Sequence, residues 1–418
     1  MSKTLFRIGI LALASLTLGG GMARAPSTRV ASGKFATTPW PYFPGSTIPL
    51  RVDGFAAPYH AALIGPGRLS AGGVYEIPAH ATAGSALLVA GNTNGLAATT
   101  LRIGLPPKAG RAFVAVASYD NGIVFHDAGD FSVLGVLATG GTPSDAAIDA
   151  LGRIAATDTQ GSDLTLATLS PWSVTHIGGV LVGDEVEIDP ATHAIFVTDR
   201  DVNGSGALTR VSLNGSVVRV ATGATAEGLA IDGPHHVVYV ANTNDGTVSA
   251  VDTRSMQVLR RFQAVPRVFS LALSGDGMRL YAISNQSIGS PFAEAGGAVA
   301  MELRTATPRI VARSPNLTFP IGVALDSVTR TLFVTDEARN EVDVLDATTL
   351  RPKHAALPTC TTPWKPSYDA ASRRLYVPCA GADSIDVFDA RSLRRVTHAP
   401  FATGSYPLAV AIWHPAPA

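Results

Sequence analysis

The sequence predicts an all-β protein in which a small β-sandwich precedes a seven-bladed β-propeller. A unit of four short strands recurs from residue 111 onward, with the period of about 40 to 45 residues that is typical of propellers. Glycine and proline, 41 and 28 of the 418 residues, supply the many turns that such a fold needs. Between residues 41 and 103, short strands separated by Gly and Pro indicate the sandwich.

The repeated units share one internal order. The clearest unit contains four apolar strands with a turn after each: Gly228–Asp232, Val237–Asn242, Thr247–Asp252 and Val258–Phe262. The first strand of successive units closes at Asp149, Asp189, Asp232, Ser274, Asp326 and Asp369. These positions lie 40, 43, 42, 52 and 43 residues apart, and we interpret residues 286–297 as a loop insertion within the long interval. Each aspartate precedes a turn, where carboxylates bind backbone amides, so we expect a structural role.

The two ends of the repeat region complete one another. Residues 112–137 supply only three strands, whereas Leu408–Ile412 reads as a first strand without the rest of its unit. Pairing this last strand with the first three closes the ring, because closure removes exposed strand edges and ties the chain ends together. Together with six complete units, this pairing predicts seven blades.

The N-terminus has the pattern of an export signal. Lys3 and Arg7 precede an apolar run at residues 8–18, and Ala23-Arg24-Ala25 supplies a small-x-small cleavage pattern. We therefore expect a periplasmic or extracellular protein, with an uncleaved anchor as the alternative. No later stretch is apolar and long enough to span a membrane, so we expect no membrane span after cleavage.

The chain therefore divides into four parts. We assign residues 1–25 to the signal peptide, 26–40 to a linker, 41–106 to the sandwich and 107–418 to the propeller. The linker is assigned because its residues are small and polar and include proline.

Four strings in the second strands carry a resemblance to a known family. They are Tyr239-Val240-Ala241-Asn242, Phe333-Val334-Thr335-Asp336, Phe196-Val197-Thr198-Asp199 and Tyr376-Val377-Pro378-Cys379. They resemble the YVTN family of β-propeller repeats over residues 111–415. The resemblance implies the fold and leaves the function open, because related propellers include lactonases, lyases and quinone-dependent dehydrogenases. The sandwich resembles the small immunoglobulin-like modules of bacterial exported proteins, without their Cys…Trp…Cys framework.

Composition and motifs restrict the function. Thirty-two basic residues balance thirty-two acidic ones, so we expect no nucleic-acid partner. The sequence has no G-x-S-x-G, H-E-x-x-H, P-loop or C-x-x-C-H motif. These features favour an exported binding or interaction protein with a small molecule, a protein or a cell-surface partner. The alternative is a lactonase-like hydrolase or lyase, possibly metal-dependent, that uses channel carboxylates.

Two local patterns suggest cross-links or metal binding. Cys360 and Cys379 fall at the same rim of the last complete unit, so we expect a disulfide in an exported chain. Asp199, Asp201 and Asn203 form the first half of a calcium loop, D-x-D-x-N-G. The twelfth position holds Arg210 instead of the bidentate glutamate, and a plain β-turn selects the same residue types, so both interpretations stay open.

The candidate ligand site lies where the first strands begin, at the mouth of the central channel. Aligning the repeats places six side chains there: Asp145, Glu185, Glu227, Arg267, Lys365 and Tyr406. Neighbouring loops add Tyr119, Asp120, Asn242, Asn244, Asp336, Arg339 and Trp364. Charges of both signs around a funnel are typical of a propeller ligand site, although a solvated tunnel would look the same. In the enzyme alternative, Glu185 or Glu227 acts as base or metal ligand, and Arg267 or Lys365 stabilises an oxyanion.

Overall fold

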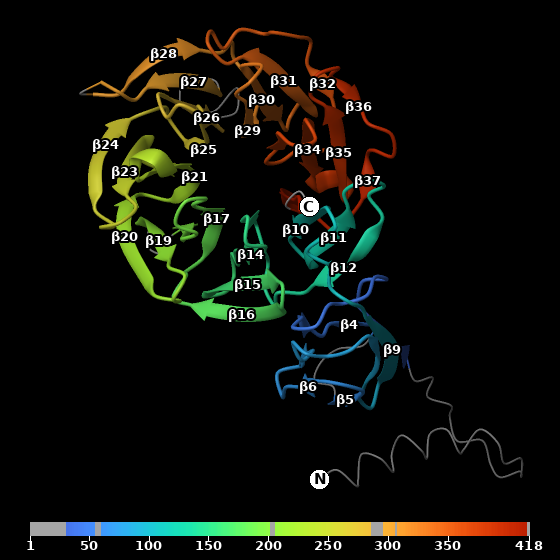
Figure 1. Ribbon diagram of the computed structural model, residues 1–418. Helices are drawn as coiled ribbons and strands as arrows, with labels where there is room; N and C mark the ends of the chain where they lie inside the picture. Colours follow the sequence, from blue (N-terminus) through green and yellow to red (C-terminus); the bar gives the residue numbers. More distant parts are fainter. Residues whose placement is uncertain (1–30, 55–59, 201–204, 286–295, 306, 416–418) are drawn as a thin grey trace, which may run out of the picture.

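The fold is a ring of β-sheets with a smaller β module attached at its rim (Figure 1). The computed structural model describes residues 31–54, 60–200, 205–285, 296–305 and 307–415. The expected signal peptide and most of the expected loop insertion lie outside the described residues. No helix in these ranges is long and apolar enough to cross a membrane.

Seven sheets of four or five strands form the ring within the described residues. Blade 1 combines both ends of the repeat region: β38 (Pro407–Trp413), β10 (Phe113–Ser118), β11 (Gly122–Asp127) and β12 (Val133–Leu137). Blade 2 contains β13 (Ala146–Ile148), β14 (Arg153–Ala156), β15 (Asp163–Leu169) and β16 (Trp172–Gly178). Blade 3 contains β17 (Gly183–Ile188), β18 (Ile195–Asp199), β19 (Gly206–Val211) and β20 (Val217–Gly223). Blade 4 contains β21 (Ala226–Asp232), β22 (Val237–Asn242), β23 (Thr247–Asp252) and β24 (Val258–Gln263).

The last three blades follow the same order. Blade 5 contains β25 (Val268–Leu273), β26 (Arg279–Ser284), β27 (Gly297–Glu302) and β28 (Arg309–Arg313). Blade 6 contains β29 (Pro320–Asp326), β30 (Thr331–Asp336), β31 (Glu341–Asp346) and β32 (Leu357–Pro358). Blade 7 contains β33 (Ser367–Asp369), β34 (Arg374–Cys379), β35 (Ser384–Asp389) and β36 (Arg394–Arg395), with β37 (Phe401–Ala402) also paired to β35. Two single-turn 3₁₀ helices, η1 (Gly233–His235) and η2 (Ala380–Ala382), lie in turns.

The ring closes as the sequence predicts. β38 pairs antiparallel with β10, so that Trp413 lies opposite Phe113 and Ala411 opposite Ala115. The Trp413 indole also donates to the Ala109 carbonyl at 2.9 Å. The first strands of neighbouring blades contact one another around the axis, and these innermost strands therefore line the channel.

Burial explains why the four strands of a blade differ in sequence. Inner strands have both faces packed between blades, so every residue of β10 is buried. The outer strand β28 has one face in solvent, and its residues alternate between exposed and half-buried. This is the expected difference between strands covered on both faces and strands covered on one.

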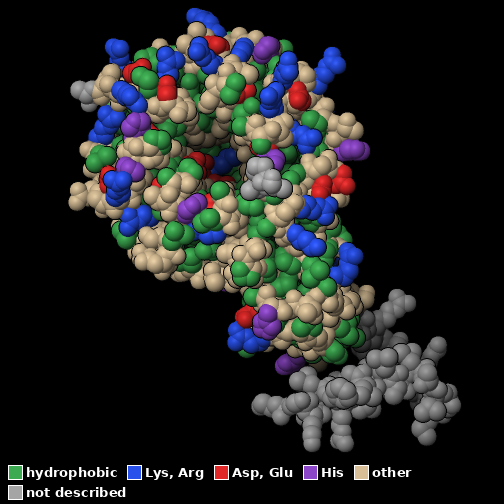
Figure 2. Space-filling model, viewed as in Figure 1, with side chains coloured by type: hydrophobic (Ala, Val, Ile, Leu, Met, Phe, Trp, Pro, Cys, Tyr) green, Lys and Arg blue, Asp and Glu red, His purple; other side chains and the backbone are tan. Residues whose placement is uncertain are grey.

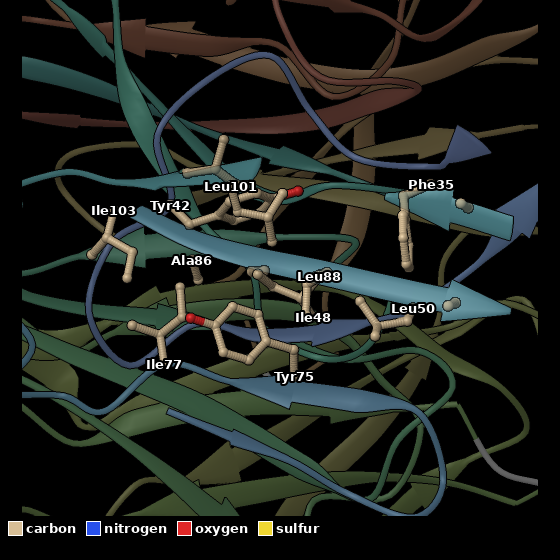
Figure 3. Packing of buried hydrophobic residues seen from close by; sticks show 14 of the residues in the cluster. Phe35, Tyr42, Ile48, Leu50, Tyr75, Ile77, Ala86, Leu88, Leu101 and Ile103 are labelled. Atoms are coloured by element: carbon tan, nitrogen blue, oxygen red, sulfur yellow. The ribbon is translucent and has the colours of Figure 1, made fainter. Parts of the chain in front are cut away.

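The N-terminal module is a small sandwich. One sheet orders β1 (Ala31–Ser32), β9 (Gly95–Ile103), β8 (Gly84–Gly91) and β5 (His60–Ile64). A second sheet has the order β3 (Thr47–Pro49), β7 (Val74–Glu76) and β6 (Arg68–Leu69). A third sheet pairs β2 (Lys34–Phe35) with β4 (Val52–Asp53). Tyr75, Ile48 and Leu88 pack between the sheets (Figure 3). Phe35 is buried in the same core, so residues from 31 onward, within the stretch assigned to the linker, are part of the module.

A short segment joins the module to the propeller. The Phe43 amide donates to the Val136 carbonyl at 2.7 Å, and the Val136 amide donates to Pro41 at 2.9 Å, which adds this segment to the outer edge of blade 1. On its other side, the Tyr42 amide donates to Arg102 of β9 at 2.8 Å. The segment therefore belongs to both sheets, and the two domains share a hydrogen-bonded boundary.

Candidate functional site

Ionisable side chains converge at the channel mouth. The cluster, here called the channel cluster, comprises five carboxyl groups and two cations: Asp145, Asp184, Glu185, Glu187, Glu227, Arg200 and Lys365. Acidic and basic side chains are visible in the hollow at the centre of the ring (Figure 2). Four blades contribute to the cluster, so it exists only when the ring is closed.

Lys365 reaches toward blade 3 from the opposite part of the ring. It directly precedes Pro366 and β33 of blade 7, and its Nζ lies 3.8 Å from Asp184 Oδ2 and 3.8 Å from Glu185 Oε2. The residue is only 9% exposed, and its Nζ has no hydrogen-bond partner among the described residues. Burial alone would lower the pKa of this ammonium, but attraction by Glu185, Asp184 and Asp145 outweighs burial and raises the pKa. Lys365 is therefore a buried cation at neutral pH.

Arg200 connects blades 3 and 4. Its Nη2 pairs with Glu227 Oε1 at 2.7 Å, and its Nε lies 3.5 Å from Asp184 Oδ1. Attraction by Asp184 is the largest cause of the raised pKa of Arg200. Glu227 also accepts a 2.5 Å hydrogen bond from Thr243 Oγ1. Asp184 thus faces two cations, one from its own blade and one from across the channel.

Three of the carboxyl groups bind the innermost strand of the next blade. Asp145 accepts from the Val186 amide at 3.1 Å, Glu185 from Leu229 at 2.8 Å, and Glu187 from Ile231 at 3.2 Å. An innermost strand has one unpaired edge, and its buried amides need partners. These carboxyl groups therefore help to hold neighbouring blades together as well as lining the channel.

Burial raises the pKa of most carboxyl groups in the cluster. It raises the pKa of Asp145 to about 6 and that of Glu187 to about 8. Burial, followed by repulsion from neighbouring carboxylates, raises the pKa of Glu185 well above its usual value and also raises that of Glu227. Groups with such values can hold or release a proton near neutral pH, which is what general acid–base chemistry requires.

Hydroxyl side chains hold the backbone that carries the channel cluster. Thr198 Oγ1 donates to the Glu227 carbonyl at 2.5 Å, and Ser144 Oγ donates to the Asp184 carbonyl at 2.5 Å. Thr335 Oγ1 donates to the Trp364 carbonyl at 2.8 Å, which fixes the backbone next to Lys365. In blade 6, a Cβ on Gly322 would come within 2.7 Å of the Lys365 Cα, so only glycine allows this close approach of two backbones.

The structure brings together four of the six side chains predicted for the mouth. Asp145, Glu185, Glu227 and Lys365 belong to the channel cluster. Arg267 donates instead to Asn285 at 3.2 Å and forms no ion pair with a described carboxylate. Tyr406 is 43% exposed and contacts Tyr119 edge-on at the rim, with ring centres 6.2 Å apart.

Three members of the cluster are absent from the sequence prediction. Glu187 carries a usable signal, because it stands two residues after Glu185 in one strand and so lies on the same face. Asp184 and Arg200 carry no such signal. The pair Arg200–Glu227 joins two consecutive blades, and the pair Asp184–Lys365 joins blades 3 and 7, which are far apart in the sequence.

The expected disulfide is confirmed. Cys360 and Cys379 are bonded, with Cα atoms 5.7 Å apart. The bond joins the segment before β33 to the end of β34, at the rim of blade 7.

The aspartates at the ends of the first strands cap turns, as predicted. Asp149 accepts from the Leu151 amide at 3.0 Å, and Asp326 accepts from the Val328 amide at 3.0 Å. They lie at the opposite ends of the innermost strands from the channel cluster. Their role is therefore to order the turns.

The calcium pattern is only partly described. Asp199 is buried, and its Oδ2 accepts hydrogen bonds from Thr209 and from Arg219, the latter at 3.1 Å. Asp201 and Asn203 lie outside the described residues. Among the residues that are described, no group of three or more His, Cys, Asp or Glu side chains is arranged to hold a metal ion. Calcium binding at Asp199, Asp201 and Asn203 stays a prediction.

Comparisons with known proteins identify the fold. No protein-family model matches this chain. No curated protein matches it in sequence. Solved structures do match, among them a functionally unknown protein from Desulfotomaculum acetoxidans, at 16% identity and a TM-score of 0.61, covering 72% of this chain and 99% of that one.

Two other solved structures have names that suggest activities. The periplasmic gluconolactonase of Pseudomonas aeruginosa matches at 14% identity and a TM-score of 0.59, over 73% of this chain and 99% of its own. Virginiamycin B lyase from Staphylococcus aureus matches at 14% identity and a TM-score of 0.51, over 64% of this chain and 87% of its own. At these identities the likeness shows the propeller fold and no activity.

Proposed function

We propose that this chain is an exported binding protein whose propeller takes a small polar ligand at the channel mouth. The observation that carries the proposal is the buried ammonium of Lys365, which has no hydrogen-bond partner among the described residues. Removing an ion from water costs several kcal/mol unless hydrogen bonds replace its hydration. Nζ is enclosed in this structure, so a polar ligand that enters from the mouth supplies those bonds once the Lys365 side chain turns toward it.

The proposal also includes export of the protein from the cytoplasm. The basic and apolar pattern of residues 1–25 supports a signal peptide, and the Cys360–Cys379 disulfide supports an oxidising compartment, periplasmic or extracellular. The YVTN-like strings and an immunoglobulin-like origin of the N-terminal module fit the same setting. A protein or cell-surface partner remains a second kind of ligand for the rim.

Thermal unfolding in the presence of small molecules tests the binding function. A ligand that binds only the folded state raises the unfolding temperature. We expect at least one compound from a panel of neutral polyols, carboxylic acids and amines to stabilise the wild-type protein and to have no effect on Lys365→Met. Lys353→Met is the matched control, because Lys353 donates to the Thr329 carbonyl in blade 6, outside the cluster. A panel without any stabilising compound, or equal stabilisation of Lys365→Met, contradicts the proposal.

A second candidate is a lactonase-like hydrolase or lyase. The raised pKa of Glu185 supports it, because Glu185 could then act as a general base or acid beside the cation of Lys365. The purified protein would then open small lactones, and Glu185→Gln would lower the rate at least a hundredfold with little change in unfolding temperature. Turnover that survives in Glu185→Gln, or no turnover by the wild-type protein, counts against this candidate.

A further inference from the structure

A buried hydrogen-bond donor and a buried hydrogen-bond acceptor face each other in the channel. Lys365 Nζ and Asp184 Oδ2 lie 3.8 Å apart, beyond hydrogen-bond distance, and neither has a hydrogen-bond partner among the described residues. An ammonium can only donate hydrogen bonds. As a carboxylate between two cations, Asp184 can only accept them at Oδ2.

We propose that the ligand of this site places a hydroxyl group between Lys365 Nζ and Asp184 Oδ2, and that it is a neutral polyhydroxy compound such as a sugar or cyclic polyol. The inference rests on the proposed binding function and specifies its ligand class. A hydroxyl oxygen accepts from Nζ while its proton is donated to Oδ2. Neither atom is accessible to solvent in this structure, so the two side chains must move apart beyond their 3.8 Å separation to admit the hydroxyl, which then bonds each atom at about 2.8 Å.

Fully charged ligand groups satisfy only one of the two atoms. An ionised carboxylate accepts from Lys365 but has no proton to donate to Asp184. An ammonium group donates to Asp184 but cannot accept from Lys365.

Neighbouring groups extend the same pattern. Glu185 Oε2 also lies 3.8 Å from Lys365 Nζ, and the buried Nε of Arg200 has no hydrogen-bond partner among the described residues. Glu185 and Arg200 therefore place a further acceptor and a further donor beside the first two atoms. Tyr119, which interacts electrostatically with Arg200, and Tyr406 provide aromatic faces at the rim for the C–H face of a sugar ring.

Isothermal titration calorimetry of the mature full-length protein tests this ligand class. The probes are D-glucose, D-galactose, D-xylose and myo-inositol, with citrate and putrescine as charged probes. We expect at least one neutral probe to bind the wild-type protein and Lys353→Met with similar affinity. Its affinity should fall at least tenfold in both Asp184→Asn and Lys365→Met, with folding checked by circular dichroism.

The outcomes separate this inference from the proposed function. Binding of citrate or putrescine without binding of any neutral probe overturns the hydroxyl inference but leaves the binding function intact. No binding of any probe, with only ordered water in the site, overturns the inference. If the variants do not fold, the affinity of the wild-type protein is measured for deoxy analogues of the bound probe, each of which lacks one hydroxyl group. One analogue should bind at least tenfold more weakly, and equal binding of all analogues overturns the inference.

Discussion

Glu187 lies two residues beyond Glu185 in the innermost strand of blade 3. It is half-buried, and its carboxyl group accepts from the Ile231 amide at 3.2 Å, with no cation of the described residues contributing to its pKa. Burial raises its pKa from its ordinary value of 4.5 to about 8. The folded protein therefore binds this proton more tightly than the unfolded chain. The resulting stabilisation is complete below pH 4.5 and is lost as the pH rises to 8.

Replacing Glu187 by Gln should remove this pH dependence. The amide keeps an acceptor for Ile231 but cannot ionise, so Glu187→Gln should be more stable than the wild-type protein at pH 8 and similar to it at pH 5. Each pH unit across this range contributes up to about 1.4 kcal/mol to the free energy of unfolding. Urea denaturation at pH 5 and pH 8 measures the free energy of unfolding of both proteins, with Glu302→Gln of β27 as the control. An unchanged pH dependence in Glu187→Gln would show that another group is responsible.

At the scale of elements, hydroxyl side chains hold neighbouring blades in register. Thr198 lies near the C-terminal end of β18. Its hydroxyl group accepts from the Glu185 amide at 3.0 Å and donates to the Glu227 carbonyl of blade 4. Thr243 makes the corresponding contact one blade further, where its single hydroxyl proton is shared between the Val268 carbonyl at 2.7 Å and Glu227 Oε2 at 2.5 Å. These bonds set the positions from which the acidic side chains of the channel cluster project.

Thr198→Val should destabilise the protein by about 2 kcal/mol, because it keeps the shape of the side chain but leaves two buried backbone groups without a partner. Thr198→Ser retains the hydroxyl group and should lose less stability than Thr198→Val. Guanidinium denaturation of the three proteins measures the difference. A valine variant as stable as the wild-type protein would mean that the hydroxyl has no role in joining the blades.

The disulfide acts on blade 7. Cys360 and Cys379 are 19 residues apart, and a cross-link of this span restricts the unfolded chain by about 3 kcal/mol. We expect the double variant Cys360→Ala, Cys379→Ala to lose about that much stability. The wild-type protein under reducing conditions should show a similar loss, whereas the double variant should be insensitive to reductant. A wild-type protein whose stability is unchanged by reductant would refute this assignment.

At the scale of the whole molecule, the module and the propeller share a core. Phe43, which is fully buried, belongs to the module side but packs edge-on against Phe125 of blade 1 and Trp172 of blade 2, with ring centres 5.3 Å and 5.9 Å away. The Trp172 indole donates to the Pro44 carbonyl at 2.9 Å. The module is therefore packed on two blades and is not a tethered appendage.

Phe43→Ala should cost about 3 to 5 kcal/mol, as expected for removal of a buried aromatic side chain. The wild-type protein should unfold in one cooperative transition, because the module and blade 1 share this core. Differential scanning calorimetry measures both effects, with Phe35→Ala as a comparison within the module core. Two separate transitions in the wild-type protein would show that the domains unfold independently.

The ring could be predicted from the sequence because its signals are local and repeat. Turn-capping residues such as Asp326 recur with a regular period, and the unpaired strand at Leu408–Ile412 has one partner that closes the ring. The docking of Phe43 could not be predicted, because strand addition at an outer edge leaves no periodic signal. The pairing of Lys365 with Asp184 was also inaccessible, since it joins blades 3 and 7, which are brought together only by ring closure.

A high-resolution crystal structure of the protein, with and without a bound neutral polyol, tests the central claim most directly. The account predicts an oxygen atom within about 3 Å of both Lys365 Nζ and Asp184 Oδ2, from water in the free protein and from a ligand hydroxyl in the complex. A direct hydrogen-bonded ion pair between these two side chains, with the polyol bound elsewhere, would contradict it.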